Sequence, residues 1–273
     1  MQPLTISLLQ TDLFWEEPER NRMHIDSQLE QLPPGSHITV LPEMFSTGFS
    51  MDPATHAETM EGLTLSWMKR VAGERKTILT GSVMTEEDGR YFNRLFWVLP
   101  NGQIGHYDKR HLFAFAGEDQ HYTPGNKRLV ASVNGWRINL QICYDLRFPV
   151  WSRQRSSYDE EGRFQPEYDV LIYVANWPER RSDAWKTLLR ARAIENQCYV
   201  VGVNRIGKDG KGIDHRGDST IIDPIGNVLH DCEDRNELYT TTLSPQLLTD
   251  TRERLPFLRD ADGFMILSDE LPE

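Results

Sequence analysis

The sequence has few cysteines, and none of them forms a pair at a known motif spacing. Cys143, Cys198 and Cys232 are the only three, and no CxxC occurs. An odd number of thiols without paired spacing argues against a disulfide framework and indicates a reducing compartment. The sequence also lacks an export-type basic leader, and no apolar run approaches the roughly 20 residues that span a bilayer. These absences predict a cytoplasmic protein without a membrane segment.

Positive charge is also scarce. Lys and Arg total 30 against 41 Asp and Glu, which gives a formal net charge of −11. Because this field repels phosphate backbones and anionic lipid heads, we expect neither nucleic acid nor a membrane as a partner. A small anionic substrate is still compatible with the charge, since one local Arg or Lys outweighs the diffuse field at contact distance.

Several catalytic signatures are absent. The sequence contains no GxSxG, no HExxH, no paired Cys/His metal-ligand spacing and no glycine-rich phosphate loop after a strand. The eight histidines are scattered along the chain, and we expect His111 and His121 to be structural or to face solvent. The sequence therefore favours neither a serine hydrolase, a zinc protease nor a nucleotide-binding enzyme.

The apolar content is sufficient for one large core. The chain has 273 residues, of which 38% are hydrophobic and 10% aromatic, and this composition fits a single domain over residues 1–273. Alternation and helical spacing predict strands that alternate with helices, which is the α/β class. The expected strands are Leu4–Gln10, His37–Leu41, Thr77–Met84, Tyr91–Leu99, Trp136–Ile142, Asp169–Ala175, Cys198–Val203, Ser219–Ile222 and Leu238–Leu243. The expected helices begin at Pro18 and at Leu63 and include Trp185–Ile194, and Arg153–Glu167 is expected to be a solvated surface excursion.

Three reactive side chains each follow a predicted strand. They are Glu43 in TVLPEMF, Lys109 in YDKRHLF and Cys143 in NLQICYDLRFP. Because α/β sheets commonly carry their sites at strand ends, we expect the three groups to meet above one sheet edge. Taken singly, each has an ordinary interpretation. Glu43 could be an exposed loop carboxylate, Lys109 a surface ammonium and Cys143 a core thiol.

Cys143 differs from the other two cysteines in its surroundings. Cys198 stands in the apolar run CYVVGV, and Cys232 stands in a late polar strand or loop. Polar Tyr144 and Asp145 follow Cys143 directly, which favours a thiol displayed at a strand-to-helix turn.

The segments around these residues resemble a known family. LPEMFSTGF, YDKRHLF and ICYDLRFP place Glu43, Lys109 and Cys143 at intervals of 66 (109 minus 43) and 34 (143 minus 109) residues. GEDQHYTPG from Gly117, ANWP from Ala175, RARAIENQCYVVGVNR from Arg190 and the pair Asn93-Arg94 extend the pattern. In this order and spacing the segments resemble the nitrilase (carbon-nitrogen hydrolase) superfamily, from the first strand to about Gly226. The resemblance implies a four-layer α-β-β-α sandwich.

The resemblance also implies catalytic roles. Cys143 is expected to be the nucleophile, Glu43 the proton-transfer base, and Lys109 the cation that faces the oxyanion. Glu118, within GEDQHYTPG, is expected to position the catalytic groups. The backbone N–H of Tyr144 is the second expected oxyanion donor.

The expected substrate pocket has aromatic walls and a cation. Phe45, Phe115 and Trp177 are expected to wall a dry pocket. Arg147 is expected to bind substrate, with Arg180 and Arg181 as the other candidates for a substrate carboxylate. Arg147 has the alternative role of a structural ion-pair partner for the cysteine turn.

The likeness of QTDLFWEEPERN, EMFSTGFSM, RHLFAFAGEDQHYTPG and ICYDLRFPVW is to the omega-amidase branch. That branch hydrolyses the terminal amide of 2-oxoglutaramate and similar dicarboxylate monoamides through a cysteine thioester, without metal or organic cofactor. The alternatives are another substrate, either deaminated glutathione or a nitrile, a non-catalytic scaffold of the same fold, and a redox or metal thiol protein.

The resemblance further implies assembly into a homodimer. RFPVW and the Trp185–Ile194 helix are the expected pairing face. Residues from about 245 to 273 are expected to form an extension that packs on the body or on a partner subunit.

Overall fold

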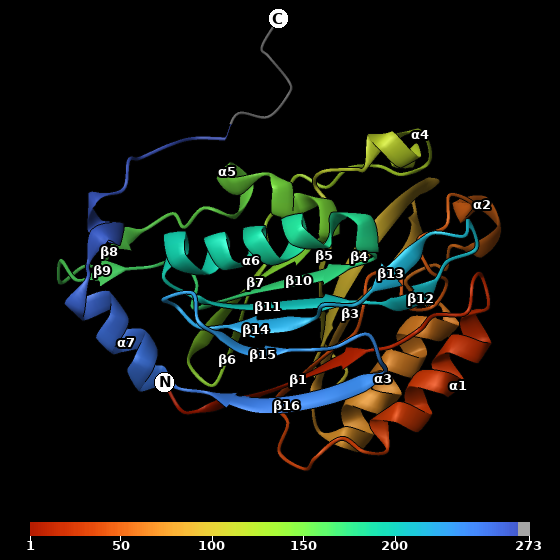
Figure 1. Cartoon of the computed structure of the whole chain (residues 1–273), viewed down its shortest axis with the longest axis horizontal. Coiled ribbons are helices and arrows are strands. Elements are labelled where there is room, and N and C mark those ends of the chain that lie inside the picture. Colours follow the sequence, from red (N-terminus) through yellow and green to blue (C-terminus); the bar gives the residue numbers. More distant parts are fainter. Residues whose placement is uncertain (267–273) are drawn as a thin grey trace, which may run out of the picture.

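Two six-stranded sheets form the centre of the computed structural model, which describes residues 1–266 (Figure 1). The first sheet has the order β16 (Glu237–Leu243), β1 (Leu4–Gln10), β2 (Ile38–Val40), β3 (Ile78–Glu87), β4 (Arg90–Val98) and β5 (Ile104–Asp108). The second has the order β15 (Val228–Asp231), β14 (Thr220–Ile222), β11 (Tyr199–Asn204), β10 (Val170–Ala175), β7 (Trp136–Ile142) and β6 (Val130–Val133). Two small hairpins add β8 (Ser157–Tyr158) with β9 (Phe164–Gln165) and β12 (Ile206–Lys208) with β13 (Asp214–Arg216).

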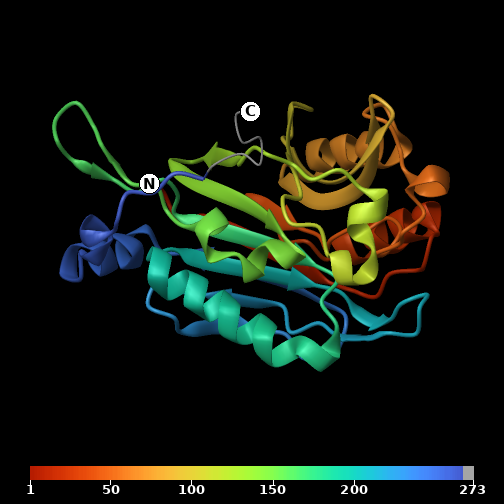
Figure 2. The ribbon, with the colours of Figure 1, turned by 90° about the horizontal axis from the view of Figure 1, so that it is seen from above.

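Helices cover the outer face of each sheet. The pair α1 (Pro18–Leu29) and α3 (Leu63–Arg75) packs on the first sheet, and α6 (Ser182–Asn196) packs on the second. Figure 2 shows the two helical layers on opposite sides of the strands. The remaining helical turns are α2 (Pro53–His56), η1 (Ala114–Ala116), α4 (Glu118–His121), η2 (Cys143–Arg147), α5 (Pro149–Ser152), η3 (Glu179–Arg181), α7 (Pro245–Arg254) and η4 (Phe257–Asp260). This arrangement confirms the expected α-β-β-α sandwich.

The largest apolar cluster fills the space between the two sheets. On β7, Ile138, Leu140 and Ile142 alternate along the strand and are all fully buried in this cluster. Alternate strand residues point to one face, so the period-2 pattern of the sequence selects this inner surface. At roughly 25 cal/mol per Å² of apolar area removed from water, burial of this kind is the main force holding the layers together.

Strand direction determines where the functional segments meet. In the first sheet, β2 and β3 run parallel, β4 reverses and β5 returns to their direction. In the second sheet, β7, β10 and β11 run parallel. The segments that follow β2 and β5 therefore leave the same edge of the first sheet, and those that follow β7 and β10 leave one edge of the second.

The predicted strands are confirmed with small shifts at their ends, and two of them, β1 and β7, have the predicted bounds. The surface excursion Arg153–Glu167 contains the small β8–β9 hairpin, which its polar sequence did not indicate. None of the described helices combines the length and apolar character that a membrane crossing requires.

The expected pairing face stays a prediction, and the structure shows which of its side chains are exposed. Trp185 and Leu189 on α6 are completely buried, because the helix has one apolar stripe and the second sheet takes it. Ile194 and Val150 remain 43% and 58% exposed.

The described part of the C-terminal region contacts the body. The Arg252 guanidinium on α7 donates to the buried carboxylate of Asp169, with Nη1 2.7 Å from Oδ1, and to the carbonyl of Tyr168 at 2.8 Å. Residues 267–273, which belong to the predicted extension, lie outside the described residues.

Candidate active site

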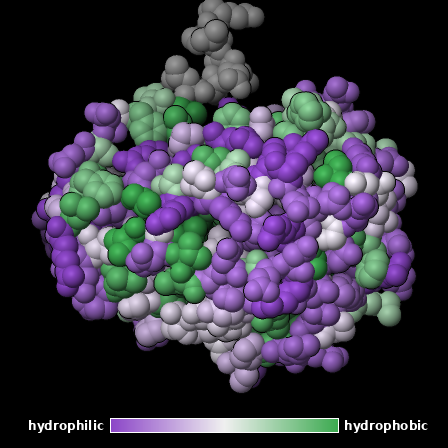
Figure 3. Space-filling model, in the orientation of Figure 1, coloured by the Kyte–Doolittle hydropathy of each residue, from purple (hydrophilic) through white to green (hydrophobic). Residues whose placement is uncertain are grey.

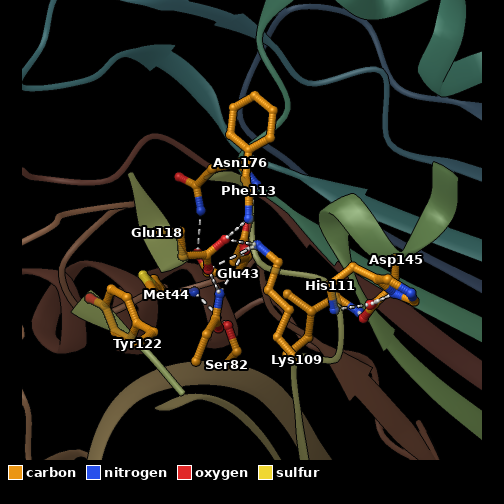
Figure 4. A network of polar contacts seen from close by, with 12 residues as sticks. Glu43, Met44, Ser82, Lys109, His111, Phe113, Glu118, Tyr122, Asp145 and Asn176 are labelled. Atoms are coloured by element: carbon orange, nitrogen blue, oxygen red, sulfur yellow. Dashed lines mark hydrogen bonds and ion pairs between the residues drawn. The ribbon is translucent and has the colours of Figure 1, made fainter. Parts of the chain in front are cut away.

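A buried ammonium between two buried carboxylates forms the centre of the site (Figure 4). Lys109 Nζ lies 2.9 Å from Glu43 Oε1 and 2.9 and 3.0 Å from the two oxygens of Glu118. All three side chains have no exposed surface. Glu43 follows β2, Lys109 follows β5 and Glu118 begins α4, so the sheet edge brings together residues that are far apart in the sequence.

Two asparagines hold the carboxylates in place. The Asn93 side chain on β4 donates to Glu43 Oε1 at 2.8 Å and to Glu118 Oε1 at 3.2 Å. The backbone N–H of Asn176 donates to Glu43 Oε2 at 2.7 Å, and its side chain donates to the Glu43 carbonyl at 2.6 Å. A buried charge is tolerable only when its hydrogen-bonding capacity is met. Asn176, which follows β10 in the second sheet, therefore holds Glu43, which follows β2 in the first sheet.

These asparagine contacts were not predicted from the sequence. Asn93 and Asn176 stand in segments that carried the family resemblance, Asn93-Arg94 and ANWP, but neither had received a role there. A signal was present, because a polar residue directly before or after an apolar strand residue is costly to bury without a partner.

The charges of the cluster shift the pKa values of Glu118 and Lys109. Burial and the neighbouring Glu43 charge raise the pKa of Glu118, although Lys109 opposes them. Burial alone lowers the pKa of Lys109, but the charges of Glu118 and Glu43 outweigh it and raise that pKa well above its ordinary value. The ammonium is therefore charged at neutral pH, and it supplies a positive charge to the site.

Cys143 stands at a sharp turn after β7. Its backbone has φ of +41°, a left-handed conformation that is uncommon for a residue with a side chain. Such strain at the end of a strand lifts the side chain out of the sheet toward the pocket. The thiol lies close enough to Glu43 and Lys109 for the charges of both side chains to act on its pKa.

The thiol is protonated in this setting. Burial, followed by the negative charge of Glu43, raises the pKa of Cys143 well above its ordinary value, and Lys109 compensates only in part. Since the thiolate is the reactive form, a base must take the proton as sulfur attacks. Glu43, whose charge already acts on the thiol, is the carboxylate placed to be that base.

A buried carboxylate supports the cysteine turn from behind. Asp145 accepts hydrogen bonds from the Tyr107 hydroxyl at 2.7 Å, from the backbone and ring nitrogens of His111 at 2.9 and 2.8 Å, and from the Ile142 N–H at 3.1 Å. The His111 ring also stacks on Phe148, with 3.8 Å between centroids. These contacts connect the residues on either side of Lys109 with those on either side of Cys143. His111 is therefore structural, as expected, and His121 is exposed.

A pocket opens onto the thiol and is lined by aromatic and cationic side chains. Tyr144, Arg147 and Trp177, which the sequence suggested as substrate-binding residues, all belong to this lining. The complete lining comprises Phe49, Phe113, Phe115, Ala116, Cys143, Tyr144, Arg147, Asn176, Trp177, Pro178, Arg180, Arg181, Asp209, Lys211, Ile213 and His215.

The expected aromatic walls need correction. Phe115 lines the pocket but is 80% exposed, so it stands at the mouth and does not enclose a dry interior. Phe45 is fully buried and packs near Trp67 in the core under the first sheet, where α3 draws it away from the pocket. Both residues carry large apolar side chains, and sequence alone does not tell a core position from a rim position.

The chain is similar to known proteins over nearly its full length. The family model described as carbon-nitrogen hydrolase matches residues 5–253. The chain is 42% identical to an omega-amidase, YafV, of Escherichia coli (strain K12), over 97% of this chain and all of that protein. It is 32% identical to a 2-oxoglutaramate amidase of Bacillus subtilis (strain 168), over 94% of this chain and 96% of that protein.

A solved structure has the same fold at high similarity. XC1258 from Xanthomonas campestris, a CN-hydrolase superfamily protein with an arsenic adduct in its active site, superposes with a TM-score of 0.94. It is 44% identical and covers 97% of this chain and all of its own.

Proposed function

Because this chain belongs to the carbon-nitrogen hydrolase family, we propose that it is an omega-amidase. It hydrolyses the terminal amide of 2-oxoglutaramate and similar dicarboxylate monoamides to the acid and ammonia. The relatives named omega-amidase and 2-oxoglutaramate amidase support this assignment, since they align over nearly the full length of both chains. The observation that carries the chemistry is the buried ion-paired cluster of Glu43, Lys109 and Glu118, whose charges act on the Cys143 thiol.

The first half of the reaction forms a thioester. Sulfur of Cys143 attacks the amide carbon while Glu43 takes the thiol proton. The carbonyl oxygen becomes an oxyanion, toward which Lys109 and the backbone N–H of Tyr144 serve as donors. Glu43 then delivers its proton to the departing nitrogen, the carbon–nitrogen bond breaks, and ammonia leaves.

The second half returns the enzyme to its starting state. Water attacks the thioester carbon as Glu43 again accepts a proton. The carbon–sulfur bond breaks, the sulfur regains a proton from Glu43, and the acid is released. Glu118 acts as a positioning residue in both halves, because its two oxygens hold the Lys109 ammonium in place. One water is consumed for each amide cleaved, and no cofactor takes part in these steps.

A group of arginines supports a substrate that carries a carboxylate. Arg147, Arg180 and Arg181 line the pocket, and none of them has an ion-pair partner among residues 1–266. The Arg147 guanidinium lies over the Trp177 ring at 4.8 Å, and that of Arg181 lies over Phe113 at 5.2 Å. Burial and the like charge of Arg180 lower the pKa of Arg181. A carboxylate in this pocket relieves that repulsion, so the arginines favour an anionic amide over a neutral one.

Replacing Arg147 or Arg181 with glutamine tests the substrate class. We expect kcat/KM for 2-oxoglutaramate to fall about 10- to 100-fold, mainly through KM, because one charge-assisted hydrogen bond contributes about 1.5–3 kcal/mol. The neutral methyl ester of the same monoamide should lose less than about threefold, since it offers no anion to the arginine. Ammonia release measures both substrates.

The same assay includes a control and rival substrates. Arg216→Gln serves as the control, because Arg216 is 55% exposed and does not line the pocket. If a nitrile or a peptide-like amide is hydrolysed while 2-oxoglutaramate is inert, the omega-amidase assignment is wrong. Equal losses on the charged and neutral amides would remove the arginines from substrate recognition.

We also propose that the protein is a cytoplasmic homodimer. Its three cysteines are free thiols, the state that a reducing compartment maintains. Figure 3 shows an apolar patch beside α7, where Ile194, Ile225 and Leu255 are 43%, 53% and 59% exposed. Light scattering of the purified chain should give twice the monomer mass of 31.6 kDa, and Ile225→Asp should shift that mass toward the monomer. A monomer at all concentrations would contradict the dimer.

A further inference from the structure

A second cluster of reactive side chains lies where the edges of the two sheets adjoin. His230 is in β15, Cys232 follows that strand, and Glu237 begins β16. Their donor atoms all lie within 4.8 Å of one another, and none of the three residues lines the pocket. β15 is the outermost strand of the second sheet and β16 that of the first, and Figure 1 shows them near each other. The cluster therefore bridges the two sheets.

The backbone holds the three side chains in this arrangement. His230 and Cys232 are two residues apart on extended chain, so their side chains point to the same side. The turn that leads from β15 to β16 is fixed by the Gln10 side chain, which donates to the carbonyls of Glu233 at 2.6 Å and Arg235 at 2.9 Å. Gln10 itself is fully buried. The turn between β15 and β16 is therefore held by a buried side chain, which keeps His230, Cys232 and Glu237 close together.

The three donor atoms lie close together. His230 Nε2 lies 2.6 Å from Glu237 Oε1, and the His230 ring stacks on Tyr239 with 3.5 Å between centroids. The Cys232 side chain is 2% exposed, and within residues 1–266 its sulfur has no hydrogen-bond partner. An imidazole nitrogen, a carboxylate oxygen and an unpartnered buried sulfur therefore face one another.

We propose that His230, Cys232 and Glu237 bind a divalent transition-metal ion, with zinc as the best fit. Zinc combines nitrogen, sulfur and carboxylate ligands in tetrahedral sites, at about 2.0–2.1 Å to nitrogen and about 2.3 Å to sulfur. Such bonds place the donor atoms roughly 3.3–3.7 Å apart. This separation lies between the 2.6 Å contact of His230 with Glu237 and the 4.8 Å limit of the cluster, so small side-chain rotations form the site.

A water molecule completes the coordination, because the chain provides three ligands. Arg235 Nη2 contacts Glu237 Oε2 at 3.3 Å, and Oε1, which now accepts from His230, is the oxygen offered to the metal. Arg235 is 58% exposed and can turn toward solvent when the ion binds. The sequence had shown no metal motif, because His-x-Cys followed by a glutamate five residues later matches none of the familiar ligand spacings.

Metal binding changes the protonation of the thiol. The ion binds the thiolate form of Cys232, so the thiol proton must leave. Binding breaks the S–H bond, forms a sulfur–metal bond and releases the thiol proton to solvent. The proton between His230 Nε2 and Glu237 Oε1 must leave that hydrogen bond as well, either to His230 Nδ1 or to solvent. Affinity therefore increases with pH. The bound ion links β15 to β16 and stabilises the edge of the sandwich without taking part in amide hydrolysis.

Zinc titration by calorimetry tests the site in the full-length Cys143→Ala protein, which removes the active-site thiol as a competing ligand. We expect one equivalent to bind. Cys232→Ser on this background should weaken binding at least about 100-fold, since loss of an outer-shell partner alone typically costs 10–100-fold. Cobalt(II) in place of zinc should give a sulfur-to-cobalt charge-transfer band that Cys232→Ser abolishes.

The controls separate this site from other ligands and from misfolding. Cys198→Ser should keep full affinity, because Cys198 is a buried thiol in another cluster. His230→Gln changes a partly exposed side chain and should weaken binding even if Cys232→Ser proves unstable. Absence of zinc binding in Cys143→Ala protein, or binding unaffected by both substitutions, would overturn the proposal. Neither result bears on the amidase assignment.

Discussion

Replacing Cys143 with alanine is expected to abolish ammonia release from 2-oxoglutaramate, with a loss of at least about 10⁴-fold in kcat. No other side chain in the pocket lining is a thiol, and the charge of Glu43 acts on this one. Without the sulfur no thioester forms, and water would have to attack an unactivated amide directly. Steady-state assays with a sensitive ammonia readout measure the residual rate.

The fold should survive this substitution. Cys143 already has a left-handed backbone with φ of +41°, and alanine tolerates that conformation no worse than cysteine does. Cys198→Ala provides the matched control, because it removes a thiol that is fully buried away from the pocket. That variant should lose stability and keep its turnover. If Cys143→Ala retained a tenth of the wild-type rate with a native circular dichroism spectrum, the nucleophile would be another group.

Replacing Lys109 with methionine is expected to reduce both activity and stability. Loss of one oxyanion donor typically lowers kcat about 10²- to 10³-fold. The side chain also separates Glu43 from Glu118, and removing one partner of a buried ion pair typically costs about 3–5 kcal/mol. The two carboxylates would then face each other at a site with no exposed surface. Urea denaturation and steady-state kinetics measure the two losses.

The stability loss should depend on pH in a defined direction. In the wild type, burial and Glu43 already raise the pKa of Glu118, and Lys109 opposes that rise. Without the ammonium the folded-state pKa rises further, so the variant gains a proton that relieves the repulsion. A raised carboxyl pKa contributes stability that is present at acidic pH and is lost as pH rises through the folded value. We therefore expect the difference in unfolding free energy between wild type and variant to be smaller at pH 5 than at pH 8.

Lys208→Met is the control for this experiment. Lys208 is 62% exposed and pairs with Asp214 at 3.4 Å on the surface, where an ion pair contributes little. Its replacement should leave both the rate and the pH dependence unchanged. A Lys109→Met protein whose stability deficit is the same at both pH values would show that the two carboxylates do not interact in the folded state.

Several features of this protein followed from local sequence. The alternation of Ile138, Leu140 and Ile142 predicted β7 with its observed bounds, because each buried position is two residues from the next. The absence of long apolar runs is matched by the described helices, none of which is suited to cross a bilayer. The likeness of the segments around Glu43, Lys109 and Cys143 to one family predicted the fold, since family motifs are written in contiguous residues.

Other features required the tertiary structure. The Asn176 contact with Glu43 joins residues 133 positions apart, and the Arg252 contact with Asp169 joins residues 83 apart. Sequence periodicity shows that a residue is buried on one face of its own element and does not identify the atoms that face it. This explains why Phe45 was expected in the pocket and lies in the core.

The sequence by itself predicted most strands of the two large sheets, the helices α1, α3 and α6, and the three reactive side chains, because these depend on spacing and residue type over a few positions. Only the packing of the two sheets decided that the Cys143 thiol is neutral at rest, that arginines crowd the pocket, and that His230, Cys232 and Glu237 face one another. Protonation, charge crowding and ligand geometry depend on distances between segments that are remote in sequence, and those distances arise only when the layers close.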